Sequence, residues 1–154
     1  MKIMLRGEPR EYEAPMTALE LAATINQAVK KESVAVKIDG VVKGLTTVID
    51  KDCEVEFLTF ADDEGKRVYR HTASHILAQA VKAIRPDVKL AIGPAIDTGF
   101  YYDFDSAEPF STEDFKAIEK EMDKIVKANY KLERFELPRE EALKLMEEKG
   151  EPYR

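Results

Sequence analysis

Hydrophobic and polar positions at the start of the chain follow two different periods. Ile3 and Leu5 alternate with polar neighbours, and this spacing predicts a β-strand. Over residues 17–31, apolar side chains return every three to four positions, which predicts an amphipathic helix. Thr17 and Glu20 have the spacing of a capping box, in which each side chain accepts a hydrogen bond from the backbone N–H of the other residue. The helix is therefore expected to begin at this box.

Strand patterns lie on both sides of that helix. Gly7-Glu8-Pro9 predicts a turn into a second strand before it, and Asp39-Gly40 predicts a turn between two strands within residues 33–49. Residues 53–60 alternate again and predict a last strand. The order of two strands, a helix and further strands predicts a small mixed sheet around one helix, the ubiquitin-like β-grasp pattern. We assign this domain to residues 1–61.

A charged stretch separates this domain from the rest of the chain. Residues 62–67 hold five charged side chains and one glycine, which predicts a linker. The pattern changes after it, and residues 68–154 are expected to form a second domain with both helices and strands. The predicted fold class is α+β.

The second domain alternates helix and strand patterns. A helix is predicted over 71–84, ended by Pro86, and two strands follow within 88–105. A second helix is predicted over 111–129, capped by Ser111 or Thr112, and a strand over 130–137. The last predicted element is a helix over 138–150, between Pro138 and Gly150. The strongest amphipathic pattern is in the helix over 111–129, where five apolar residues share one face and are expected to pack in the core. They are Phe115, Ile118, Met122, Ile125 and Val126.

Composition excludes several classes of protein. The net charge is −6 over 154 residues, so the chain as a whole is not a basic nucleic-acid binder, and any RNA contact would need a local patch. No apolar run approaches the roughly 20 residues of a membrane span. The one cysteine, Cys53, can form no disulfide within the chain and is expected to be a reduced core thiol. We expect a cytoplasmic protein.

The two histidines of the chain, His71 and His75, lie one helical turn apart. Side chains at i and i+4 share a helix face, so the two imidazoles could hold one metal ion or one substrate group. In metalloproteases of the H-E-x-x-H type a glutamate follows the first histidine. Here Thr72 occupies that position, and two nitrogens are fewer ligands than zinc usually takes from a protein. A purely structural role for both histidines stays open on spacing alone.

The residues that flank the two histidines favour a functional role for the pair. The run HTASHILAQAVKAIRPDVKLAIGPAIDTGFYYDFD, which begins at His71, is similar to threonyl-tRNA synthetase in three places: the H-[ST]-x-x-H helix, AIGP and GFYYDF. The residues before it resemble the TGS domain at the start of bacterial threonyl-tRNA synthetases. STEDFKAIEKEM and GEPYR follow in the same order and spacing. The resemblance extends over the whole chain and identifies the second domain as the N-terminal part of the threonyl/alanyl-tRNA synthetase type of editing domain.

This resemblance implies a function. The parent enzyme would be a threonine--tRNA ligase that joins threonine to tRNA(Thr) with ATP, and the editing domain would hydrolyse mischarged Ser-tRNA(Thr). The aminoacylation core, to which the family assigns ATP, magnesium and zinc, and the anticodon-binding domain are absent from this chain, so no cofactor is expected here. The implied partner is the acceptor end of tRNA(Thr), with no membrane, and the parent is expected to be a homodimer.

The resemblance also assigns roles to histidines and to the last residue. His71 and His75 match the editing pair of the family; His71 is expected near the water or the scissile ester, and His75 is expected to bind and orient. In the family a lysine follows G-E-x-Y, and Arg154 stands in that place. Arginine keeps its proton, so it could bind an ester or a phosphate but could not transfer a proton.

Three residues of the aromatic strand are expected to bind substrate. They are Tyr101, Tyr102 and Asp103, within GFYYDF. One tyrosine could stack on adenine while the other points away, because strand side chains alternate. Packing of both tyrosines within the sheet is the alternative.

The family completes its editing site with a C-x-x-x-H pair that this chain does not contain. We therefore expect no useful hydrolysis of Ser-tRNA(Thr) by the chain alone, and weak or no zinc binding at His71 and His75. Two other hypotheses stay open: a non-catalytic module that binds RNA or protein, and a stand-alone editing factor, which would need the missing pair. A truncated editing domain is expected to leave apolar surface uncovered.

Overall fold

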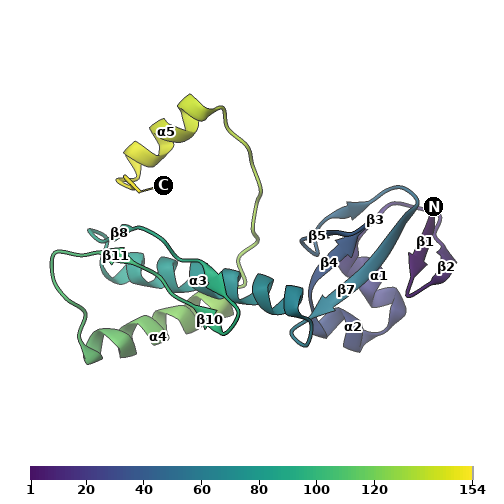
Figure 1. Ribbon diagram of the computed structural model, residues 1–154, viewed down its shortest axis with the longest axis horizontal. Coiled ribbons are helices and arrows are strands. Elements are labelled where there is room, and N and C mark those ends of the chain that lie inside the picture. The colour runs from purple at the N-terminus through teal and green to yellow at the C-terminus, as the bar shows by residue number, and fades with distance from the viewer. Residues whose placement is uncertain (154) are drawn as a thin grey trace. The chain divides into compact units, whose positions relative to one another are not determined.

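The computed structural model describes residues 1–153 (Figure 1), and the chain divides into two compact units, Met1–Tyr69 and Arg70–Arg154. The division falls within helix α3 (Asp63–Ile84), which is longer than predicted. The sequence prediction of a linker over 62–67 is therefore wrong in its local structure, because most of these residues form the first turns of α3. Among the described residues, no helix is long and apolar enough to cross a membrane.

The early start of α3 has local causes. Asp63 and Glu64 lie in its first turn, where carboxylates interact favourably with the helix dipole. Glu64 also forms an ion pair with Lys37, with 2.9 Å between Oε1 and Nζ, and this hydrogen bond raises the pKa of Lys37. Gly65 lies against the backbone of Thr59 at the end of the preceding strand, a close approach that a residue without a Cβ allows.

The first unit is a five-stranded sheet packed on two short helices. Its strand order is β2-β1-β7-β4-β5, with β1 and β7 parallel and the other neighbours antiparallel. This confirms the predicted β-grasp arrangement. The elements are β1 (Lys2–Leu5), β2 (Glu8–Glu11), β3 (Met16–Thr17), α1 (Ala18–Ile25), α2 (Gln27–Glu32), β4 (Ser33–Ile38), β5 (Val41–Lys43), β6 (Val48–Ile49) and β7 (Cys53–Thr59). The core lies between sheet and helices and includes Ile3, Leu21, Val36 and Val55, each at most 1% exposed.

The predicted helix over 17–31 begins as expected but is broken in the middle. The capping box is confirmed: Glu20 N–H donates to Thr17 Oγ1 at 3.2 Å, and Thr17 N–H donates to Glu20 Oε2 at 2.8 Å. Asn26 then takes an extended conformation, and its Oδ1 accepts from Val29 N–H at 2.8 Å. Asn26 thus ends α1 and caps α2, because its side chain competes with the helical hydrogen bonds.

Cys53 is a buried thiol on the core side of β7, as predicted. Desolvation raises its pKa. The thiolate fraction at neutral pH is therefore low, which fits a packing role rather than a reactive one.

The second unit contains a long irregular hairpin, most of α3 and two further helices. Its elements after α3 are β8 (Lys89–Leu90), β9 (Ala95–Ile96), β10 (Gly99–Phe100), β11 (Phe104–Asp105), α4 (Thr112–Ala128) and α5 (Arg139–Glu148). β8 pairs antiparallel with β11, and β9 pairs antiparallel with β10. Backbone hydrogen bonds from Ala91 N–H to Asp103 O (3.0 Å) and from Asp103 N–H to Ile92 O (2.6 Å) continue the pairing between these two strand pairs. The two predicted strands thus form one hairpin.

α3 and α4 pack side by side through a small apolar core (Figure 1), which includes Ala80, Val81, Val88 and Ile118. The stripe predicted on α4 is only partly core. Ile118, Met122 and Ile125 join the cluster, whereas Phe115 and Val126 are 56% and 61% exposed. The prediction is wrong for these two residues, because within the described chain nothing covers the ends of the stripe.

Arg85 holds the connection between the hairpin and α4. Its guanidinium donates to Glu108 O at 2.9 Å and to Asp114 Oδ2 at 2.7 Å, and its Cζ lies 4.4 Å from the centroid of the Phe110 ring. Ser111 caps α4 as predicted: its hydroxyl accepts from Asp114 N–H at 3.4 Å, and Asp114 Oδ2 accepts from Ser111 N–H at 2.7 Å.

These contacts predict an acid-dependent stability. The hydrogen bonds from Ser111, backbone first, and the charge of Arg85 lower the pKa of Asp114. A lowered folded-state pKa stabilises the fold above the unfolded value, about 4, and this contribution is lost as pH falls through the folded pKa. The stability difference between the wild type and Asp114→Asn should therefore be constant above about pH 5 and shrink in more acidic solution. Urea unfolding at several pH values measures it, and a difference independent of pH would contradict the assignment.

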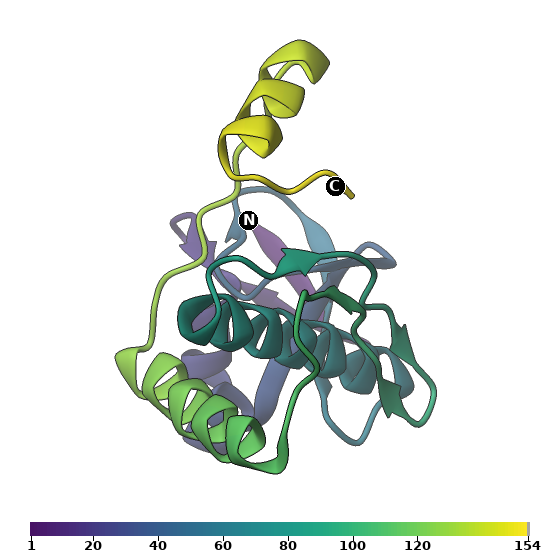
Figure 2. The same cartoon turned by 90° about the vertical axis from the view of Figure 1, so that its left-hand side faces the viewer.

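The predicted strand over 130–137 is wrong. These residues are all described, form no strand and are exposed, with Leu132 87% and Phe135 68% exposed. They run as an extended segment from α4 to α5 (Figure 2). Apolar alternation favours a strand only where a partner edge is available, and the described chain provides none here. α5 begins after Pro138 and ends near Gly150 (φ +67°), as predicted.

Candidate functional site

The two histidines contact each other on one face of α3. The Nε2 atoms of His71 and His75 are 3.0 Å apart, and the ring planes meet at 86° with centroids 4.5 Å apart. Both residues are exposed. The rings therefore point in the same direction into solvent and are not sealed in apolar packing. The exposure of both rings does not fit a purely structural role in apolar packing.

Hydrogen bonds of Ser74 and Arg70 hold the turn of α3 that carries His71 and His75. Ser74 is fully buried, and its hydroxyl donates to His71 O at 2.6 Å, which secures the helical turn between the two rings. Arg70, one residue before the pair, donates from Nη1 to Asp97 O at the tip of the hairpin. The hairpin thus runs along α3 with its tip at the histidine end.

The distance between the two Nε2 atoms constrains their protons. A hydrogen bond between two imidazoles needs one N–H donor and one neutral acceptor nitrogen. The arrangement suits general base catalysis, because a neutral imidazole can accept a proton from water near pH 7.

Nothing near the pair completes a metal site. Among residues 1–153, no three His, Cys, Asp or Glu side chains are grouped so that they could hold an ion. Two imidazoles alone are fewer ligands than a zinc ion usually takes from a protein. Metal binding at His71 and His75 is thus not supported by the donor set, and its weakness stays a prediction.

The C-terminal segment docks on the histidine face of α3. Lys82 follows His75 by seven residues, so it lies on nearly the same face about 10 Å further along the axis. Lys82 Nζ is 2.8 Å from Glu151 Oε1, and Glu151 Oε2 accepts from Leu90 N–H at 2.9 Å. Glu151 is 7% exposed, so this carboxylate is a buried anchor. Tyr153 donates to Asp105 Oδ2 at 3.0 Å, which raises the pKa of Tyr153.

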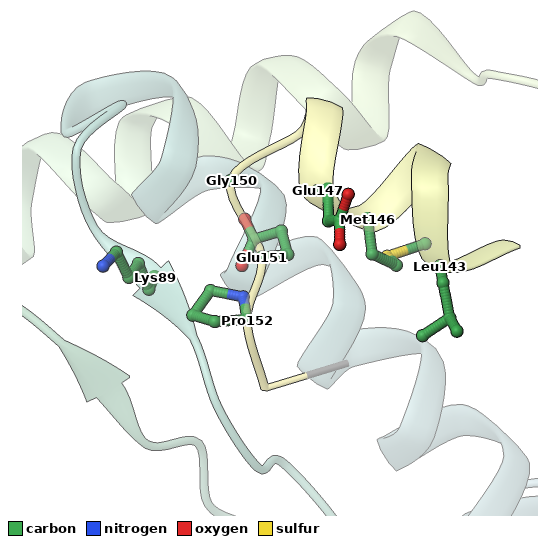
Figure 3. A pocket seen from close by; sticks show the side chains of 7 residues that line it. All are labelled: Lys89, Leu143, Met146, Glu147, Gly150, Glu151 and Pro152. Atoms are coloured by element: carbon green, nitrogen blue, oxygen red, sulfur yellow. The ribbon is translucent and has the colours of Figure 1, made fainter.

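A cavity of about 480 Å³ lies between α5 and the start of the hairpin. Figure 3 shows Lys89 on one side of Glu151 and Pro152, with Met146 and Leu143 of α5 on the other. Arg154, the predicted site residue that follows this anchored segment, lies outside the described residues.

Tyr102 lies in a different environment from the histidines. Its ring stacks on Phe104 (centroids 4.9 Å apart, planes at 16°) and lines an apolar cavity of about 500 Å³ with Leu77 and Val81 of α3. Leu77 is about 200° around the helix from His75, so this cavity and the imidazoles do not share a helix face. The histidine pair therefore does not face the ring of Tyr102.

The other two predicted substrate residues lie on the hairpin surface. Tyr101 is 51% exposed and points away from the cavity that Tyr102 lines, in agreement with strand alternation. Asp103 is exposed, and its backbone forms the bonds to Ala91 and Ile92. Roles in substrate binding stay predictions for all three residues.

Sequence reasoning missed Gly93 and the Lys82–Glu151 anchor. A Cβ on Gly93 would lie 2.0 Å from Cδ2 of Tyr102, so the glycine makes room for this ring. A glycine inside a strand pattern is a signal for such a close approach. Leu90 and Glu151 are 61 positions apart, and no local pattern connects them.

Comparison with known proteins found similarities for both parts of the chain. Residues 3–59 match the model of the TGS domain. The whole chain is 58% identical to the threonine--tRNA ligase of Caldanaerobacter subterraneus subsp. tengcongensis, and 54% identical to those of Acetivibrio thermocellus and Clostridium kluyveri. The chain is thus similar over its whole length to threonine--tRNA ligases. It spans 24% of the length of each of these relatives.

Identity over the full chain places both units within one threonine--tRNA ligase sequence. The similarity to these ligases that the sequence resemblance implied is thus present over the whole chain. A free TGS module of another protein would match over the first unit alone, whereas here the match includes the histidine helix and the hairpin.

Proposed function

We propose that the parent protein joins threonine to tRNA(Thr) with ATP and that the second unit of this chain contributes to hydrolysis of mischarged Ser-tRNA(Thr). Sequence identity of 54–58% to ligases over the whole chain supports the first part. The observation that carries the second part is the contact between the exposed His71 and His75 rings.

The need for editing follows from the size of the substrate. Serine lacks one methyl group of threonine, and a contact of that size is worth only about 1–3 kcal/mol, so the synthetic site cannot reject serine sufficiently. Hydrolysis of the aminoacyl ester requires an oriented water, a proton acceptor and donors for the developing oxyanion. The histidine pair supplies the proton acceptor and a means to orient the water.

The histidine pair would act together with groups outside this chain. The anchored segment at Glu151 brings the end of the described chain to the histidine face of α3. The family's C-x-x-x-H pair, which this sequence lacks, would complete the pocket. We propose that ATP, magnesium and zinc bind in the aminoacylation core, since the described residues offer no group of three metal ligands.

The proposed partner of the second unit is the acceptor end of tRNA(Thr). With a net charge of −6, the chain would not hold tRNA by its overall charge, so the remaining domains of the parent would supply most of the affinity. We further propose that the parent is a cytoplasmic homodimer.

A deacylation assay tests the proposed editing role. Ser-tRNA(Thr) should be lost no faster with residues 1–154 than without protein, whereas a chain extended through the C-x-x-x-H region should accelerate its loss by at least about 100-fold. Thr-tRNA(Thr) is the matched control and should be spared. Rapid deacylation by residues 1–154 alone, or none by the extended chain, would contradict the proposal.

A further inference from the structure

The first unit contains a cavity of about 300 Å³ at one edge of its sheet. Its floor is apolar, and Leu5 and Val55 of this floor belong to the buried core. Phe57 of β7, Ile25 at the end of α1 and Val29 of α2 complete it. A volume of 300 Å³ is at the lower end of the range of small-molecule sites.

The wall of this cavity on β2 is charged. β2 is the edge strand, and its register pairs Ile3 with Arg10 and Leu5 with Glu8. Directly opposed residues of an antiparallel pair lie on the same face of the sheet. Because Ile3 and Leu5 face the core, Glu8 and Arg10 also lie on the core-side face, where α1 and α2 would otherwise meet apolar side chains. Both residues are exposed and line the cavity.

Arg6, at the turn before β2, adds a second arginine to the same wall. Its φ is +51° and that of Gly7 is +80°, so both residues of this two-residue hairpin loop are left-handed. The hairpin between β4 and β5 has the same loop with Asp39 (φ +48°) and Gly40 (φ +81°). Asp suits the first position because its short side chain tolerates this conformation, whereas arginine is disfavoured there. A residue held in such a conformation points to a role for its side chain.

The charges on this wall have no partners in the described chain. The side chains of Arg6, Glu8 and Arg10 form no hydrogen bond or ion pair among residues 1–153. Glu56, which also lines the cavity, instead interacts electrostatically with Lys37. Two guanidinium groups and one carboxylate thus remain available beside an apolar floor.

We propose that this cavity binds a small carboxylate with an apolar body, of the size of a hydrophobic α-amino acid. The guanidinium groups of Arg6 and Arg10 would bind the carboxylate, for which arginine is well suited, and the apolar body would cover Leu5, Val55 and Phe57. Glu8 would pair with the α-ammonium group, which favours the amino acid over its deaminated counterpart. The same carboxylate disfavours a phosphate dianion, which it would repel.

Edge strands also carry charges on their core side to prevent sheets from pairing edge to edge. That explanation accounts for Glu8 and Arg10 without a ligand. It does not account for arginine at a left-handed position that asparagine or glycine would fill with less strain. The two explanations differ in whether a ligand binds, and this can be measured.

Titration of the isotope-labelled chain with L-leucine, followed by amide NMR shifts, tests the proposal. Saturable shifts confined to Arg6, Arg10, Val29 and residues 55–57 are expected, with a dissociation constant on the order of 0.1–1 mM. 4-Methylpentanoate, which lacks the ammonium group, should bind at the same residues about tenfold more weakly if Glu8 takes part. Shifts with inorganic phosphate but not with L-leucine would overturn the proposal, as would no saturable shift with L-leucine up to about 20 mM.

Three variants separate binding from folding. Arg10→Gln should weaken L-leucine binding by at least about tenfold, because a charge-assisted bond is lost. Arg6→Asn should weaken binding while it raises the unfolding temperature, since asparagine fits the left-handed turn. Lys43→Gln on the opposite edge strand, β5, removes one positive charge away from the cavity and should leave binding unchanged. Undiminished binding in both arginine variants would overturn the proposal, whatever their stability.

Discussion

Replacement of both His71 and His75 by alanine in the parent enzyme is expected to slow hydrolysis of Ser-tRNA(Thr) by at least about 100-fold, the usual worth of a positioned proton acceptor. Threonylation of tRNA(Thr) should change by less than about twofold, because the proposed function assigns aminoacylation to a different part of the parent enzyme. Both side chains are exposed, so the fold should lose less than about 0.5 kcal/mol. The expected result is therefore a selective loss of editing.

The two single variants should each cost nearly as much as the double variant. The Nε2 atoms are 3.0 Å apart and share a hydrogen bond, and residues that act as a unit have non-additive effects. Gln79→Ala is a matched control, since Gln79 is exposed and lies one turn after His75 on α3. Single-turnover deacylation of purified Ser-tRNA(Thr) gives the rates. Wild-type rates in the double variant would exclude the histidines from the reaction, and additive single effects would exclude the shared proton.

Local patterns were sufficient to predict most of the first unit. Its strands, the Thr17–Glu20 box and the Asp39-Gly40 turn depend on residues close together in sequence, and all of them are present. The predicted helix was wrong only at Asn26, where one side chain caps the next helix. Periodicity cannot detect such a break, because the apolar positions on both sides stay in phase.

The second unit was harder to predict because its geometry depends on distant contacts. The histidine pair could be placed from its spacing, since i and i+4 share a helix face. The position of Tyr102 could not, because it depends on the room beside Gly93 and on the face of α3 that the hairpin covers. The anchor at Glu151 depends on Lys82 and Leu90. Residues 130–137 show the reverse case, in which a strand pattern is present but no partner strand is.

Gly65→Ala is expected to destabilise the first unit by about 2 kcal/mol, although alanine is the better helix former. The added Cβ would lie 1.9 Å from Thr59 O and 2.8 Å from Thr59 C. Thr59 cannot withdraw easily, because Asp62 Oδ2 accepts from its N–H at 2.8 Å, its O accepts from Asp62 N–H at 3.1 Å, and β7 pairs with β4. Overpacking against fixed backbone costs about 3 kcal/mol, and the helix propensity of alanine returns about 1 kcal/mol of this.

Urea unfolding followed through amide signals of β7 and the first turn of α3 measures this loss in the unit concerned. Gly44→Ala is the matched control, because a Cβ at Gly44 meets no atom within 4 Å and its φ is not positive; its stability should change by less than about 0.5 kcal/mol. If Gly65→Ala were as stable as the wild type, α3 could not begin against the end of β7. The first turns of α3 would then be the linker that the sequence pattern predicted, which makes this substitution a direct test of where the helix starts.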